Sequence, residues 1–172
     1  VIRHVPAAPQ SALVGGAEWT DGCDFDAGLL AASGGRDVLV VPTAATYENP
    51  THVVERARRW FGALDAEVSV LDVYRRPDAS DEALVRVARE ARFVYVCGGS
   101  PMHLRSVLKD TPLWDALVAG LRDGAVLAGS AEGATVLCSH MVDTRGGAFT
   151  VGLDLLTAVT VIPRYDSWSE DK

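Results

Sequence analysis

The sequence predicts an α/β fold in which a mainly parallel sheet is flanked by helices on both faces. Short apolar runs alternate with segments whose apolar residues recur at helical spacing, almost from one end of the 172 residues to the other. Two of these runs, residues 37–41 and 93–96, are almost continuously apolar, which is typical of strands buried on both faces. We expect one domain that spans residues 1–172, because this length is typical of a single α/β unit.

The expected strands follow one another along the chain with turn or loop signals between them. A continuous apolar run or a two-residue alternation indicates each strand, together with β-branched residues. In order, they are residues 12–14, 37–41, 67–71, 93–96, 125–128, 149–151 and 159–162.

The expected helices lie between these strands and are indicated by apolar stripes and by their first residues. They cover residues 50–64, 81–91, a segment that begins at 101, 111–123 and 132–138. Pro101 and Pro112 fit the first turn of a helix, where the missing N–H has no partner to lose. Ser80 is the expected N-cap of the helix at 81–91.

The composition argues against several kinds of partner. A net charge of −7 at pH 7 and a pI near 5.0 oppose binding to nucleic acid or to an anionic membrane surface, and no run approaches the ~18 apolar residues of a membrane span. The cysteines, Cys23, Cys97 and Cys138, are far apart, and residues 1–10 do not resemble a secretory signal, so we expect a cytoplasmic protein with buried thiols. The histidines show no metal-ligand spacing, and we expect neither a metal nor a cofactor.

One loop has the outline of a catalytic motif without its reactive atom. Ligands bind to open α/β sheets beyond the carboxyl ends of the strands, and residues 129–133, Gly-Ser-Ala-Glu-Gly, lie at such an end with the spacing of a G-x-S-x-G nucleophile elbow. The central residue is Ala131, whose methyl group cannot attack a carbonyl, so a covalent acyl-enzyme is excluded at this position. Ser130 is the nearest hydroxyl, but it precedes the apex and is expected to point away from the groove.

Several segments together resemble the serine peptidase family that contains dipeptidase E (aspartyl dipeptidase) and cyanophycinase. The matching segments, in chain order, are ALVGGAEW (12–19), VLVVPTAATYENP (38–50), VYVCGGSPMHLRSVL (94–108), VLAGSAEGATVLC (126–138), GGAFTVGLDLL (146–156) and VIPRYDSW (161–168). The resemblance covers nearly the whole chain and implies a class I glutamine amidotransferase-like fold with flavodoxin-like layering. It also implies a further strand and the acidic third member of a catalytic triad beyond Lys172, and it is compatible with a homodimer.

The resemblance implies roles for individual residues, and two of them are substituted. The family's nucleophilic serine corresponds to Ala131, and its histidine base corresponds to Arg164. Arginine stays protonated at any working pH, so Arg164 cannot accept a proton from a serine. Glu132 stands where a small residue is usual, and Gly98 and Gly99 match the region where the family builds part of its oxyanion hole.

The substitutions leave three interpretations open. The first is a diverged, non-hydrolytic protein whose anion-friendly pocket binds a small anionic or peptide-like molecule, or a protein partner, unless Glu132 simply pairs with Arg164 and closes the pocket. The second is an enzyme of another reaction class, in which Glu132 and Arg164 act as carboxylate and electrophile without a covalent intermediate. The third is a peptidase inactivated in the laboratory, with Ala131 in place of serine.

Further candidate residues follow from their places in the same loops. Cys97 and His103 are weaker catalytic candidates, since a buried thiol and a helix histidine more often serve in packing. The expected binding or wall residues are Gly98, Gly99, Ser100, Ser130, Glu18, Tyr165 and Asp166, with Trp19, Tyr47, Glu48 and Trp168 as aromatic or acidic neighbours that could equally be ordinary loop packing.

Overall fold

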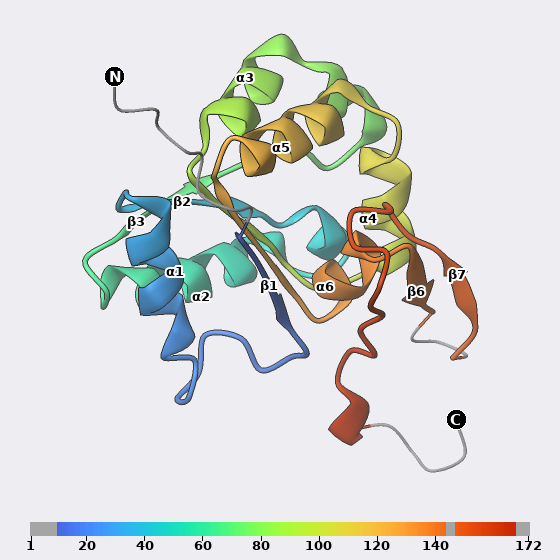
Figure 1. Ribbon diagram of the computed structural model, residues 1–172, viewed down its shortest axis with the longest axis horizontal. Coiled ribbons are helices and arrows are strands. Elements are labelled where there is room, and N and C mark those ends of the chain that lie inside the picture. Colours follow the sequence, from blue (N-terminus) through green and yellow to red (C-terminus); the bar gives the residue numbers. More distant parts are fainter. Residues whose placement is uncertain (1–9, 144–146, 168–172) are drawn as a thin grey trace, which may run out of the picture.

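The computed structural model describes residues 10–143 and 147–167 and shows a parallel sheet between two layers of helices (Figure 1). The sheet has five strands in the order β1-β5-β4-β2-β3, and every neighbouring pair is parallel. The strands are β1 (Gln10–Val14), β2 (Asp37–Val41), β3 (Glu67–Val70), β4 (Phe93–Val96) and β5 (Val126–Ser130). This arrangement confirms the predicted fold class.

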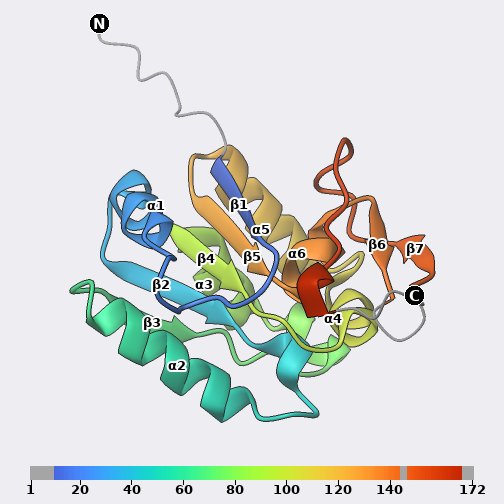
Figure 2. The same cartoon turned by 90° about the horizontal axis from the view of Figure 1, so that it is seen from below.

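The helices cover both faces of the sheet (Figures 1 and 2). One face carries α1 (Phe25–Ser33) and α2 (Pro50–Gly62), and the other carries α3 (Glu82–Glu90), α4 (Pro101–Leu108), α5 (Pro112–Arg122) and α6 (Glu132–Leu137). The short 3₁₀ helices are η1 (Thr43–Ala45), η2 (Arg76–Ser80) and η3 (Tyr165–Ser167). An antiparallel hairpin of β6 (His140–Val142) and β7 (Phe149–Val151) follows α6.

Alternate residues of the central strands build two separate cores. Val38 and Val40 of β2 and Tyr95 of β4 face α1 and α2, whereas Leu39 and Val96 of the same strands face the helices on the other side. All five side chains are at most 3% exposed. Because both faces of each strand are buried, these strands are continuously apolar, as expected for a covered parallel sheet.

Three sequence-based details needed correction. The N-cap of α3 is Asp81 and not Ser80, because the Asp81 carboxylate accepts hydrogen bonds from the N–H groups of Ala83 and Leu84 at 2.8 and 3.2 Å. The expected strand at 159–162 does not form; its apolar side chains include the half-exposed Val159, and no strand of the described residues pairs with it. The helix α1 was not predicted, because its sequence, FDAGLLAAS, contains a glycine and no clear apolar stripe.

Within the described ranges, no helix combines the length and the apolar character that crossing a membrane requires.

The helix α1 carries a buried acid that the sequence pattern did not reveal. Asp26 is fully buried, and its Oδ2 accepts a hydrogen bond of 2.9 Å from Trp60 Nε1 of α2. Its Oδ1 has no hydrogen-bond partner among the described residues. Burial raises the pKa of Asp26 from 3.8 to about 6, and the Trp60 hydrogen bond partly opposes this shift.

The raised pKa of Asp26 predicts a stability change with a defined sign. The folded protein holds this proton more tightly than the unfolded chain does, so the Asp26 contribution is fully present below about pH 4 and is lost as the pH rises through about 6. Asp26→Asn removes the ionisation and should be more stable than the parent at pH 8 by roughly 2–3 kcal/mol, with a much smaller difference at pH 4. Urea unfolding at both pH values measures this.

Asp24→Asn is the matched control, since Asp24 is exposed and its side chain caps no N–H of α1. An advantage of Asp26→Asn that does not grow between pH 4 and pH 8 would contradict the prediction.

Candidate functional site

The chain turns sharply at Ala131, between the end of β5 and the start of α6. Ala131 has φ 48° and ψ −117°, a conformation that is strained for any residue with a Cβ. Its N–H donates to the carbonyl of Val14 at 2.8 Å, which fixes the turn to β1. A side chain at Gly133 would lie 2.4 Å from the carbonyl oxygen of Val96, so α6 packs directly on β4. The backbone therefore forms a nucleophile elbow with a methyl group at its apex.

Glu132 follows the apex and is almost completely buried, with 4% of the residue exposed. Its Oε2 accepts one hydrogen bond from the N–H of Gly99, at 3.1 Å, and another from Nη2 of Arg164, at 3.0 Å. The sequence left open whether Glu132 and Arg164 pair, and in this structure they do. The N–H of Gly99, which the resemblance assigned to an oxyanion hole, already holds a carboxylate oxygen.

Arg164 reaches the elbow from a loop near the end of the described chain. Its backbone N–H donates to the carbonyl of Gly15 at 2.8 Å, and its Cγ would lie 3.1 Å from a Cβ at Gly16. The loop after β1 and the loop around Arg164 therefore touch. Although Nη2 binds the buried Glu132, the Arg164 side chain is 56% exposed.

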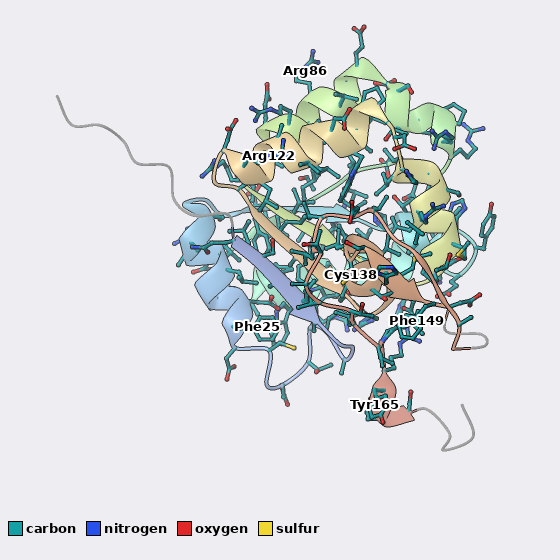
Figure 3. All side chains as sticks on the ribbon, turned by 45° about the vertical axis from the view of Figure 1, so that its right-hand side comes forward. Phe25, Arg86, Arg122, Cys138, Phe149 and Tyr165 are labelled. Atoms are coloured by element: carbon teal, nitrogen blue, oxygen red, sulfur yellow. The ribbon has the colours of Figure 1, made fainter. Side chains whose placement is uncertain are left out.

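A groove of about 610 Å³ lies beside Arg164. Its lining residues are Gly15, Gly16, Ala17, Ile162, Arg164, Tyr165, Asp166 and Ser167. Tyr165 and Asp166 were expected near the site, and both are exposed here; Figure 3 shows Tyr165 on the η3 turn, away from the body of the fold. Sequence reasoning missed Ile162, which it assigned to a strand, and Ser167, whose N–H and hydroxyl donate to the Arg164 carbonyl.

The groove is not lined by three other predicted site residues, Ser100, Ser130 and Glu18. Ser100 caps α4 through a hydrogen bond from the His103 N–H to its Oγ, at 3.3 Å. Ser130 is fully buried, and its hydroxyl has no hydrogen-bond partner among the described residues. Glu18 pairs with Arg56 of α2 at 3.3 Å and does not line the groove.

The groove is also not lined by the candidates Trp19, Tyr47, Cys97 and His103. Trp19 is 6% exposed and packs on Tyr95, with ring centroids 5.0 Å apart. His103 binds the Tyr74 carbonyl through Nε2 at 2.9 Å and packs against the exposed Tyr47. Burial, with a smaller contribution from the charge of Glu18, raises the pKa of the Cys97 thiol far above its usual range.

Glu48 and Trp168 were the remaining wall candidates. Glu48 is exposed and does not line the groove, and Trp168 lies outside the described residues.

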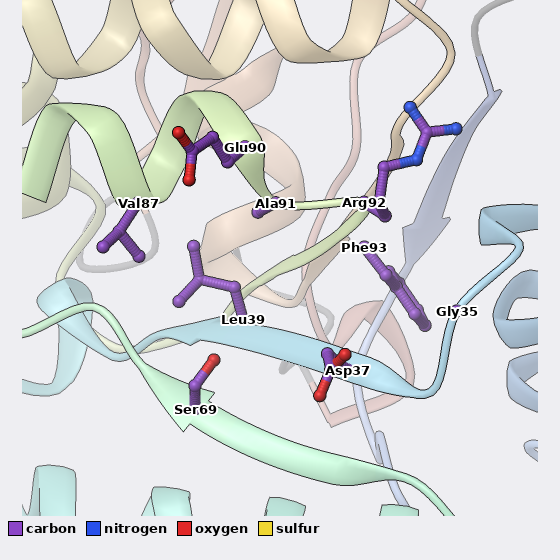
Figure 4. Close-up of a pocket in the computed structure, with 9 residues that line it drawn as sticks. All are labelled: Gly35, Asp37, Leu39, Ser69, Val87, Glu90, Ala91, Arg92 and Phe93. Carbon is purple, nitrogen blue, oxygen red and sulfur yellow. The ribbon is translucent and has the colours of Figure 1, made fainter.

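A second cavity, of about 260 Å³, lies at the opposite end of the strands (Figure 4). Val87 and Glu90 of α3 form one side of it, and Leu39 and Ser69 form the other. Asp37 and Phe93, the first residues of β2 and β4, also line it. This cavity is therefore separate from the elbow, which lies beyond the carboxyl ends of the strands.

Comparison with known proteins gives consistent matches. The model of "Peptidase family S51" matches residues 15–167. The crystal structure of a peptidase from an acI-B1 actinobacterium superposes with a TM-score of 0.82 at 30% identity, covering 92% of this chain and 69% of that one. A putative peptidase E of Listeria monocytogenes shares the fold, with a TM-score of 0.71 at 22% identity, covering 93% of this chain and 81% of that one.

Among curated proteins, the chain is similar to cyanophycinases. That of Trichormus variabilis is 31% identical over 132 residues, which are 73% of this chain and 43% of the relative. The chain thus spans less than half the length of the cyanophycinase that it matches.

The strain at the elbow predicts that glycine stabilises its apex. Ala131→Gly should raise the free energy of unfolding by about 1 kcal/mol, since relief of roughly 1–3 kcal/mol of strain exceeds the extra entropy of glycine in the unfolded chain. Ala134→Gly, a buried α6 position outside the strained turn, is the control and should destabilise. If urea unfolding shows both variants equally destabilised, the strain is absent.

The ion pair predicts unequal effects of removing its two members. Arg164→Ala leaves the buried Glu132 carboxylate with the Gly99 N–H as its one remaining donor among the described residues. It should cost about 2 kcal/mol, less than for a fully buried pair because Arg164 is half exposed. Glu132→Ala leaves no buried charge and should cost about 1 kcal/mol or less. The double variant should resemble Glu132→Ala. Chemical denaturation measures the free energy of unfolding of all three variants. A loss in the double variant equal to the sum of the two single losses would contradict this prediction.

Proposed function

The chain belongs to peptidase family S51, and we propose that it is a diverged, non-hydrolytic member that binds a small anionic or peptide-like ligand beside Arg164. The observation that carries the proposal is the contact of Glu132 with both Gly99 and Arg164, directly behind an elbow that lacks a nucleophile. This contact occupies a donor that hydrolysis would need, and it leaves other N–H groups of Arg164 available to a ligand.

Three features argue against hydrolysis through an acyl-enzyme. Ala131 offers no oxygen or sulfur to attack a carbonyl. Arg164 stands where the resemblance places a base, and a guanidinium cannot accept the proton. The N–H of Gly99 is held by Glu132, so it is not free to stabilise a developing oxyanion.

The groove beside Arg164 supports the binding part of the proposal. A groove of about 610 Å³ is large enough for a short peptide or a small acid. Arg164 gives one nitrogen to Glu132, and its half-exposed guanidinium carries further N–H donors that suit a carboxylate. Asp166 lines the same groove and offers an acceptor for an amino group, so that the two charges match the two ends of a zwitterionic, peptide-like molecule.

The alternative of acid–base chemistry by Glu132 has less support. A general base must reach the proton that it removes, and the Glu132 side chain is 5% exposed with Oε2 engaged by two donors. The geometry therefore favours a positioning role for Glu132.

Binding and labelling experiments test the proposal together. A dipeptide such as Asp-Ala should raise the Tm of the parent in a thermal-shift titration, and Arg164→Ala should weaken its binding at least tenfold, about 1.4 kcal/mol. Arg36→Ala, which removes an exposed arginine of a distant ion pair, is the matched control and should leave the affinity unchanged. The parent should not react with a fluorophosphonate probe. Equal affinity in the two variants, or covalent labelling of a serine in the parent, would refute the proposal.

A further inference from the structure

The Glu132 carboxylate lies in a small carboxylate site formed by two distant parts of the chain. The loop after β4 provides the N–H of Gly99, and the loop before η3 provides the guanidinium of Arg164. A Cβ at Gly98 would lie 2.8 Å from Oε2 of Glu132, which is too close for a real contact. The oxygen therefore occupies space that exists only because residue 98 has no side chain.

The backbone around this carboxylate site is held in place by contacts that do not involve Glu132. The N–H of Ser100 donates to the carbonyl of Ala44 at 2.8 Å, and a Cβ at Gly99 would lie 2.4 Å from the same oxygen. Arg164 is held through its backbone hydrogen bond to Gly15. Because these contacts do not involve Glu132, shortening Glu132 should leave the Gly99 N–H in place and the Arg164 side chain, whose backbone is anchored, within reach of the same point.

The donors of the carboxylate site define which ligands it can bind. It offers one backbone N–H and one guanidinium N–H to a single oxygen, in a place from which the burial of Glu132 excludes most water. Charge-assisted hydrogen bonds of this kind favour an anion over a neutral acceptor. The present occupant is a carboxylate, so a free ion that matches it is a small monocarboxylate such as formate.

We infer that Glu132 is an internal ligand: its carboxylate fills a one-carboxylate anion site formed by Gly99 and Arg164, and formate binds there once the side chain is shortened. The inference and the proposed function both involve Arg164. The inference rests on the proposed function only where it treats this region as a ligand-binding site. In the native protein this contact restricts the proposed ligand to the outer part of the site. A ligand carboxylate reaches the outer N–H groups of Arg164, while Glu132 keeps it from the N–H of Gly99.

The experiment compares formate titrations of Glu132→Ala and of the parent, with sodium chloride at equal ionic strength as the reference. Formate should raise the Tm of Glu132→Ala by roughly 2–5 °C at concentrations well above its Kd, and it should move the amide resonance of Gly99 in an ¹⁵N-correlated NMR spectrum. The parent and Glu132→Gln, which keeps the volume of the side chain, should show neither effect. Glu132→Ala combined with Arg164→Ala should lose the response.

Two results would overturn the inference: an equal response in the parent, or a Gly99 resonance that formate does not move in Glu132→Ala. If Glu132→Ala does not fold, Glu132→Ser opens the same space and is judged by the same criteria. A parent that fails to bind dipeptides while Glu132→Ala binds formate would reject the proposed function alone. The reverse result would reject the inference alone.

Discussion

The oxygen atom Oε2 of Glu132 joins three loops that are far apart in the sequence. The elbow supplies the carboxylate, the loop after β4 supplies the N–H of Gly99, and the loop before η3 supplies Arg164, which is itself bound to Gly15 after β1. Because the carboxylate is buried, these two donors replace hydrogen bonds that water would otherwise provide. One buried oxygen thus links the loops at the carboxyl end of the sheet, while backbone hydrogen bonds hold each loop in place.

The same contact bears on the proposed loss of hydrolysis as much as the absence of a serine at residue 131 does. A nucleophile restored at residue 131 would still face a donor occupied by Glu132 and a guanidinium in place of a base. Ala131, Glu132 and Arg164 therefore form one coupled set. A change at residue 131 alone would leave the other two members of this set in place.

The layered sheet was predictable because its signals are local and repeated. Apolar runs such as residues 37–41 occur wherever both faces of a strand are buried, and proline or threonine marks the starts of α4 and α5. The absence of a strand at 159–162 was not predictable, because an apolar run does not reveal whether a partner strand stands beside it. Asp26 was missed for a similar reason, since burial of an acid within a short helix leaves no periodic trace.

The site was predictable only in its parts. The motif placed Ala131 at an apex, and the resemblance placed Arg164 nearby, but neither gave the direction in which Glu132 points. That direction depends on the empty space above Gly98, which a sequence does not display. Glu18 and Trp19 lie in a loop at the carboxyl end of the sheet, where site residues were expected. Glu18 instead pairs with Arg56, and Trp19 packs on Tyr95, so neither lines the groove.

The main-chain geometry at Ala131 does not depend on what that side chain is. The hydrogen bond to Val14 and the approach of Gly133 to Val96 involve backbone atoms, so the turn keeps its shape whichever small residue stands at its tip. Architecture and reactivity are thus separable here. A substitution at the tip therefore changes the chemical group that is presented there, while the backbone contacts that shape the elbow remain available.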